Sequence, residues 1–163
     1  MQKRFIGIIT AAILATALCL AGSQAWAKGN SPETVVKEFA TAYFMLDEKM
    51  GDYLSRSALG GEEQVDTVAL YLEMRTREAQ SRGYDLSYLQ MKPILMKTKV
   101  LEQDDAGALV AFEADALRSV NPLFRIVGWI FGLLEEHTYS DTIRLVREDG
   151  AWKVGPGAFD LPM

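Results

Sequence analysis

The spacing of apolar residues predicts helices in the chain that follows residue 30. Ser31-Pro32-Glu33 is typical of a helix start, because Ser31 can cap free amides and Pro32 suits the first helical position. Apolar residues then recur every three or four positions as far as Leu46, which indicates one amphipathic helix. Asp47 can cap a short second helix, and a third is expected from near Glu62 to Gly83. The apolar stripe of the third helix consists of Val65, Val68, Ala69, Leu72 and Ala79.

Beyond Gly83 the apolar residues alternate with a period of two, which predicts strands. The expected strands cover 94–100, 108–117, 138–147 and 151–154, and polar turns join the first pair and the last pair. One face of the first strand is expected to carry Ile94, Met96, Thr98 and Val100. One face of the third is expected to carry Tyr139, Asp141, Ile143 and Leu145. The fold class is therefore predicted to be α+β, with three N-terminal helices packed on an antiparallel sheet of about four strands.

The first 27 residues have the three parts of a secretory signal peptide. Lys3 and Arg4 precede an apolar run over 5–21, and Ala25-Trp26-Ala27 fits the cleavage site. We expect cleavage after Ala27, leaving a single mature domain, 28–163, that is periplasmic or secreted. The alternative is an uncleaved membrane anchor, because the apolar run reaches the lower limit of spanning length.

Charge and composition exclude several classes of function. The net charge is −5, and removal of Lys3 and Arg4 with the signal peptide makes it −7, so a nucleic-acid partner is not expected. Cys19 is the only cysteine and lies within the signal peptide, which leaves no disulfide, thiolate metal site or cysteine nucleophile. His137 is the only histidine, so a multi-histidine zinc site is excluded as well. We therefore expect no metal and no cofactor.

The order of the elements and three stretches of sequence resemble the nuclear transport factor 2-like superfamily, whose fold is a cystatin-like α+β cone. The stretches are the helical opening, 31–43, Asp47 at the second helix, and the closing strand pair, 145–154. The resemblance covers nearly all of the mature chain. It implies a curved sheet that wraps a long helix around a central cavity, with pairing of copies through the sheet, so a homodimer is possible. Because this fold hosts unrelated functions, no catalytic residue is carried over.

Asp141 and Tyr43 are the candidate catalytic residues. If Asp141 points into the cavity, burial would raise its pKa and suit it to general acid or base chemistry. Tyr43 or Tyr139 could then stabilise an oxyanion, with Glu113 or Asp115 nearby, in isomerisation or dehydration of a small apolar substrate. The alternative is that Asp141 is a solvated strand residue and Tyr43 a helix core residue whose hydroxyl reaches the rim.

An apolar insertion at 119–136 separates the second and third strands, where a simple hairpin would suffice. It is too short to cross a bilayer and carries the aromatic residues Phe124, Trp129 and Phe131. It is expected either to close the open end of the cone as a lid or to serve as an interface. The interface could face a second copy, an envelope protein or, less well given the charge of −7, a membrane surface.

Three classes of function follow from these observations. The favoured hypothesis is an exported, non-catalytic module that binds a small apolar molecule or an envelope protein through its cavity and insertion. Its binding residues would be Phe124, Trp129, Phe131 and Tyr139. The alternatives are a cofactor-free isomerase or dehydratase and an oligomerising scaffold. A cavity with two converging polar groups would favour the enzyme, whereas one filled by large apolar side chains would favour the other two.

Overall fold

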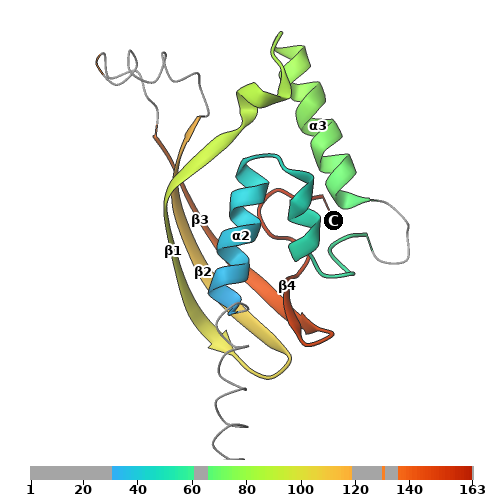
Figure 1. The fold of residues 1–163 in the computed structure, drawn as a ribbon, viewed down its shortest axis with the longest axis vertical. Coiled ribbons are helices and arrows are strands. Elements are labelled where there is room, and N and C mark those ends of the chain that lie inside the picture. Colours follow the sequence, from blue (N-terminus) through green and yellow to red (C-terminus); the bar gives the residue numbers. More distant parts are fainter. Residues whose placement is uncertain (1–30, 61–65, 119–129, 131–135, 163) are drawn as a thin grey trace, which may run out of the picture. The chain divides into compact units, whose positions relative to one another are not determined.

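An antiparallel sheet of four strands, with helices on one of its faces, makes up the part of the chain that the structure describes (Figure 1). The computed structural model describes residues 31–60, 66–118, 130 and 136–162. The elements belong to one compact unit that begins at Pro32. In chain order they are helix α2 (Pro32–Phe44), 3-10 helix η2 (Glu48–Tyr53), helix α3 (Thr67–Ser81), 3-10 helix η4 (Leu86–Leu89), and strands β1 (Met91–Gln103), β2 (Gly107–Arg118), β3 (Glu136–Glu148) and β4 (Ala151–Val154).

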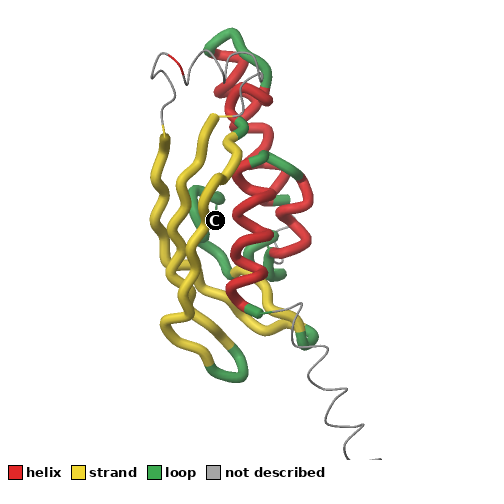
Figure 2. The backbone as a smooth tube through the Cα atoms, turned by 60° about the vertical axis from the view of Figure 1, so that its left-hand side comes forward, coloured by secondary structure: helices red, strands yellow, loops and turns green. Residues whose placement is uncertain are grey.

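Each strand of the sheet pairs with the next strand along the chain. Its strands pair antiparallel in the order β1-β2-β3-β4, and the long strands curve around α2 (Figures 1 and 2). Beyond β4, Leu54 forms a parallel bridge to Val154, and the Ser55 N–H donates to the Val154 carbonyl at 2.8 Å. The predicted α+β arrangement of helices on one face of a curved sheet is confirmed.

The predicted alternation holds in β2 and fails at one place in β1. The inward residues of β2 are almost fully buried, with Phe112 at 0% exposure and Ala114 at 2%. Ile94 was expected on the inner face of β1, but 58% of it is exposed. The pairing with β2 shifts between Pro93 and Leu95, so Ile94 has no partner of its own and the alternation restarts after it.

Helix α3 begins later than the sequence suggested and presents a different face. Its first residue is Thr67 rather than one near Glu62, because the Asp66 carboxylate accepts from the Val68 and Ala69 amides and caps the helix there. Ala69, expected in the apolar stripe, is exposed, and Tyr71 takes a buried place instead. Tyr71 is the largest of the buried side chains of α3.

The core lies between α2 and the inner face of the sheet. Val36, Phe39 and Ala40 of α2 are fully buried, as are Ile143 and Leu145 of β3. Full burial of one large apolar side chain contributes about 1.5–3 kcal/mol relative to exposure. Aromatic rings meet inside the cone: they belong to Phe39, Tyr43, Phe44, Phe112 and Phe159.

Candidate functional site

After β4 the chain folds back over the inner side of the sheet, in a segment that we call the C-terminal strap (residues 155–162). The strap starts at Gly155, whose N–H donates to the Arg144 carbonyl at 2.8 Å. A side chain at this position would crowd the same carbonyl oxygen, because a Cβ there would lie 3.2 Å from it. Ala158 and Leu161 anchor it, with 4% and 8% exposure. Between them, Phe159 has a φ of 51°, in the left-handed region that bulky residues rarely adopt.

The ring of Phe159 lies in the middle of the aromatic core. Its centroid is 4.7 Å from that of Tyr43, 5.4 Å from Phe112, 5.6 Å from Phe44 and 5.7 Å from Phe39. The contact with Phe39 is nearly parallel, at 6°, and that with Phe112 is edge-on, at 69°. Aromatic pairs in such arrangements add about 0.5–1.5 kcal/mol each beyond the area they bury. The strap therefore places an aromatic side chain in the interior of the cone.

Asp141 and Tyr43, the two candidate catalytic residues, both bind the backbone of the strap. Asp141 lies on the inner face of β3, as predicted, and its Oδ2 accepts from the Phe159 N–H at 3.0 Å. Its Oδ1 accepts from the Thr142 N–H at 2.7 Å. The Tyr43 hydroxyl oxygen accepts from the Asp160 N–H at 3.3 Å. The two side chains thus meet at consecutive amides of the strap rather than at an open position for a substrate.

The pKa of Tyr43 also argues against a role in proton transfer. Burial raises the pKa of Tyr43 far above that of an ordinary tyrosine, and the neighbouring Tyr71 raises it further. The phenol therefore stays protonated at neutral pH and gives up its proton less readily than an ordinary tyrosine. Its ring stacks on that of Tyr71 with centroids 5.1 Å apart. Tyr43 is a core residue, 5% exposed, whose hydroxyl contacts the strap backbone.

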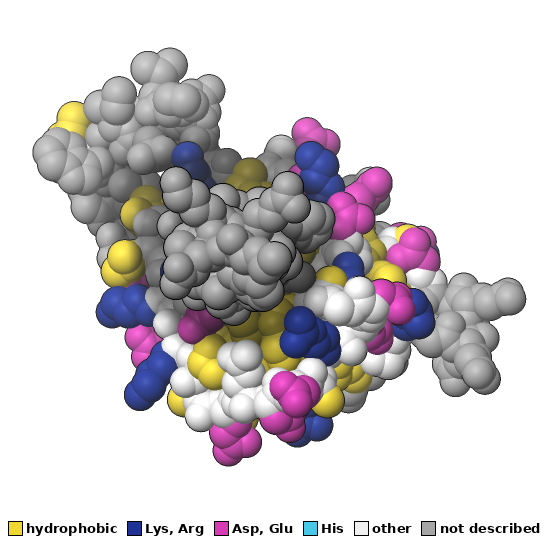
Figure 3. Space-filling view, turned by 60° about the horizontal axis from the view of Figure 1, so that its bottom comes forward, with side chains coloured by type: hydrophobic (Ala, Val, Ile, Leu, Met, Phe, Trp, Pro, Cys, Tyr) yellow, Lys and Arg dark blue, Asp and Glu magenta, His cyan; other side chains and the backbone are white. Residues whose placement is uncertain are grey.

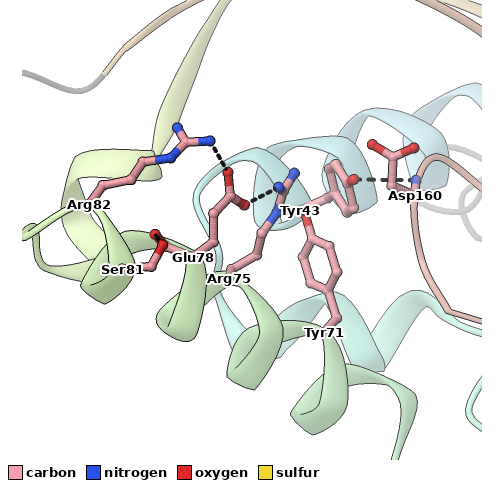
Figure 4. A network of polar contacts seen from close by, with 7 residues as sticks. All are labelled: Tyr43, Tyr71, Arg75, Glu78, Ser81, Arg82 and Asp160. Atoms are coloured by element: carbon pink, nitrogen blue, oxygen red, sulfur yellow. Dashed lines mark hydrogen bonds and ion pairs between the residues drawn. The ribbon is translucent and has the colours of Figure 1, made fainter.

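A polar network on α3 continues from this tyrosine pair (Figure 4). Arg75 Nε donates to the Tyr71 hydroxyl at 3.2 Å, and Arg75 Nη1 donates to Glu78 at 2.7 Å. Arg82 pairs with the other oxygen of Glu78 at 2.8 Å. Because the side chains of Arg75 and Glu78 are only about one third exposed, at 32% and 31%, this network borders the core rather than open solvent.

Tyr139 is the one predicted binding residue that the structure describes. Its ring lies 4.8 Å from the ring of Phe44, and its hydroxyl lies 3.3 Å from the sulfur of Met91. Burial raises the pKa of Tyr139 above its ordinary value. Phe124, Trp129 and Phe131 lie outside the described residues. Tyr139 therefore lines the same aromatic interior as Phe159, from the β3 side.

Sequence reasoning missed three residues of this site: Phe159, Tyr71 and Arg75. The expected end of the last strand at residue 154 is confirmed, and the aromatic residue Phe159 beyond it was the available signal for a returning segment. Tyr71 was missed because the predicted apolar stripe passed through its neighbour Leu72 instead. Its pairing with Arg75 at a spacing of four follows once Tyr71 is placed inward.

Other features that the described residues could offer are a metal site, a membrane span or a ligand groove. Within residues 31–60, 66–118, 130 and 136–162, no three of His, Cys, Asp and Glu gather as a metal site. Over the same ranges, no helix is long and apolar enough to cross a membrane. A shallow groove of about 380 Å³ lies at the β1–β2 turn, lined in part by Glu102, Asp104 and Arg144. Cationic and anionic side chains are mixed over the face drawn in Figure 3.

Comparison with known proteins adds little to this picture. No family model matches the chain, and no curated protein does. Among solved structures, one similar chain is the crystal structure of a proposed calcium/calmodulin dependent protein kinase II association domain from Xanthomonas campestris. The two share 15% identity over 71% of this chain and 74% of the other, with a TM-score of 0.38. The fold class therefore rests on the strand pairing and helix packing of this chain itself.

Proposed function

We propose that this protein is an exported, non-catalytic module of the nuclear transport factor 2-like type, which binds a small apolar molecule or an envelope protein. One observation carries the proposal: Asp141 and Tyr43 hold consecutive amides of the C-terminal strap. A general acid or base needs a free proton position facing a substrate. These two side chains have structural partners, and the interior beside them is filled with aromatic rings, which favours binding over catalysis.

Export is the second part of the proposal. The charged start, the apolar run and the Ala25-Trp26-Ala27 site support it. The mixed charges in Figure 3 and the mature charge of −7 support a small molecule or protein as the partner, rather than nucleic acid.

Self-association is a second candidate function, favoured by exposed apolar residues on β1. Ile94, Leu95 and Leu101 are 58%, 50% and 48% exposed, on a strand at the edge of the sheet. Light scattering of the purified chain, compared with a Leu95→Asp variant, tests this candidate. A dimer that dissociates in the variant would support it, and a monomer in both would contradict it.

Native mass spectrometry of the protein purified from its own envelope tests the binding proposal directly. We expect a mass above that of the chain, equal to a bound small molecule or partner. In the same strain, Tyr43→Phe should still complement a deletion, because it keeps the shape of the side chain and removes only the phenolic proton. If this variant folds, reaches normal levels and fails to complement, the enzyme hypothesis replaces the module.

A further inference from the structure

Phe159 is bound inside the cone in the way that a ligand would be. Its ring contacts four other rings, and its own nitrogen, three bonds away from the ring, donates to a carboxylate, that of Asp141. Nitrogen, Cα, Cβ and ring together form the skeleton of a phenethylamine. The surroundings of Phe159 thus describe a site for an aromatic ring joined by two carbons to a hydrogen-bond donor.

The strap holds Phe159 at a conformational cost. A φ of 51° at a residue with a bulky side chain is sparsely populated, and such positions typically cost about 1–3 kcal/mol. Gly157, two residues earlier, has a φ of 81°, which glycine adopts freely and which provides a natural pivot. Phe159 as a residue is only partly buried. Strained backbone that persists next to a site is typical of segments that move.

We propose that the interior around Asp141 is a binding site for arylalkylamines, which the C-terminal strap occupies through Phe159 until such a ligand displaces it. This rests on the proposed binding function and names its ligand class and its resting state. The strap acts as an internal competitor: being part of the same chain, it faces the site at a high effective concentration.

The charge of Asp141 selects the amine. A backbone N–H donates to the Asp141 carboxylate without a charge of its own, whereas an ammonium in the same place adds an ion pair to the hydrogen bond. The surrounding ring faces attract a cation as well. An anion of equal size would meet the Asp141 carboxylate and be repelled. Tyr43 loses the Asp160 amide when the strap leaves, and its hydroxyl then offers a second contact beside the ring.

The first test compares two probes on the full chain and two variants by calorimetric titration. Phenethylamine and 3-phenylpropionate share the ring and two-carbon chain but carry opposite charges. We expect Phe159→Ala to bind phenethylamine at least about tenfold more tightly than the unaltered chain, because the competitor is removed. Adding Asp141→Asn should weaken this binding by about tenfold or more. The anionic probe should bind to none of the three.

The second test needs no variant, so it holds even if Phe159→Ala fails to fold. Hydrogen exchange is followed by NMR on the unaltered chain, with and without millimolar phenethylamine. We expect the amides of Phe159 and Asp160 to lose protection when the amine is present, while core amides of β2 and β3 keep theirs. Unchanged protection at both amides overturns the inference, and so does a folded Phe159→Ala that binds the amine no better.

The outcome for the proposed function is separate. If native mass spectrometry finds a bound molecule or partner while both amine tests fail, only the ligand class and the displacement of the strap are wrong. If the amine tests succeed, the module binds at this interior site.

Discussion

Replacing Trp152 with alanine tests how the last strand faces the core. Trp152 is 6% exposed on β4 and stands two residues from the fully buried Val154. A buried tryptophan covers about 200 Å² of mostly apolar surface, which at about 25 cal/mol per Å² corresponds to about 5 kcal/mol. Residual structure in the unfolded chain lowers this, and alanine keeps part of the contact. We therefore expect Trp152→Ala to lower the free energy of unfolding by about 3–5 kcal/mol.

Urea denaturation of the mature chain measures this loss, with Arg147→Ala as the matched control. The guanidinium of Arg147, an exposed residue, lies 5.5 Å from the Trp152 ring centroid. Removing the cation alone should cost about 0.5–1 kcal/mol, as for other exposed cation–π pairs. The ratio of the two effects separates the buried ring from its surface contact. A loss below about 1 kcal/mol for Trp152→Ala, the size of a surface change, would refute the inward facing of β4.

Three further predictions concern other parts of the chain. N-terminal sequencing of the exported protein should begin at Lys28, whereas an intact Met1 in a membrane fraction would contradict cleavage after Ala27. Asp66→Ala should destabilise the fold by about 1 kcal/mol through the lost cap of α3, and Asp66→Ser should restore most of it; equal losses in denaturation would exclude capping. Asp104→Ala should be less stable than the parent at neutral pH but not in strong acid. The Ala106 and Gly107 amides lower the pKa of Asp104, so its stabilisation is present above the unfolded pKa and is lost as the pH falls through the folded one. Denaturation midpoints that differ equally at both pH values would argue against this.

The strands could be predicted well because their evidence is local. In the strand expected at 108–117, a period of two puts Val110, Phe112 and Ala114 on one face, and each is at most 2% exposed. It failed at Ile94 because a strand irregularity depends on the partner strand, which a single run of residues does not reveal. The third helix failed for another reason: Tyr71 lies three residues after Val68 and shares its buried face, whereas Ala69 points to nearly the opposite side of the helix, and packing against the rest of the chain decided which face is buried.

The candidate site was harder to predict because its contacts join distant parts of the chain. Asp141 was correctly placed on the inner face of β3, yet its partner is an amide 18 positions away. The Tyr43 hydroxyl meets an amide 117 positions away. Nothing in the pattern around either residue distinguishes a free carboxylate or phenol from one that a returning segment has already bound. The strap and its contacts with Asp141 and Tyr43 could be recognised only in the folded structure.

The bridge from Leu54 to Val154 has a consequence for how copies of this sheet could meet. The Ser55 N–H uses the Val154 carbonyl, so the outer edge of β4 is occupied where a further strand would pair. The opposite edge, β1, carries the exposed lysines Lys92, Lys97 and Lys99 together with Pro93 and the irregularity beside it, all of which disfavour pairing with another strand. If those lysines were neutralised, two sheets could join edge to edge through β1, and each would still end in a blocked β4. Pairing through β1 alone closes at two copies, and the bridge at Val154 disfavours further growth at the β4 edge.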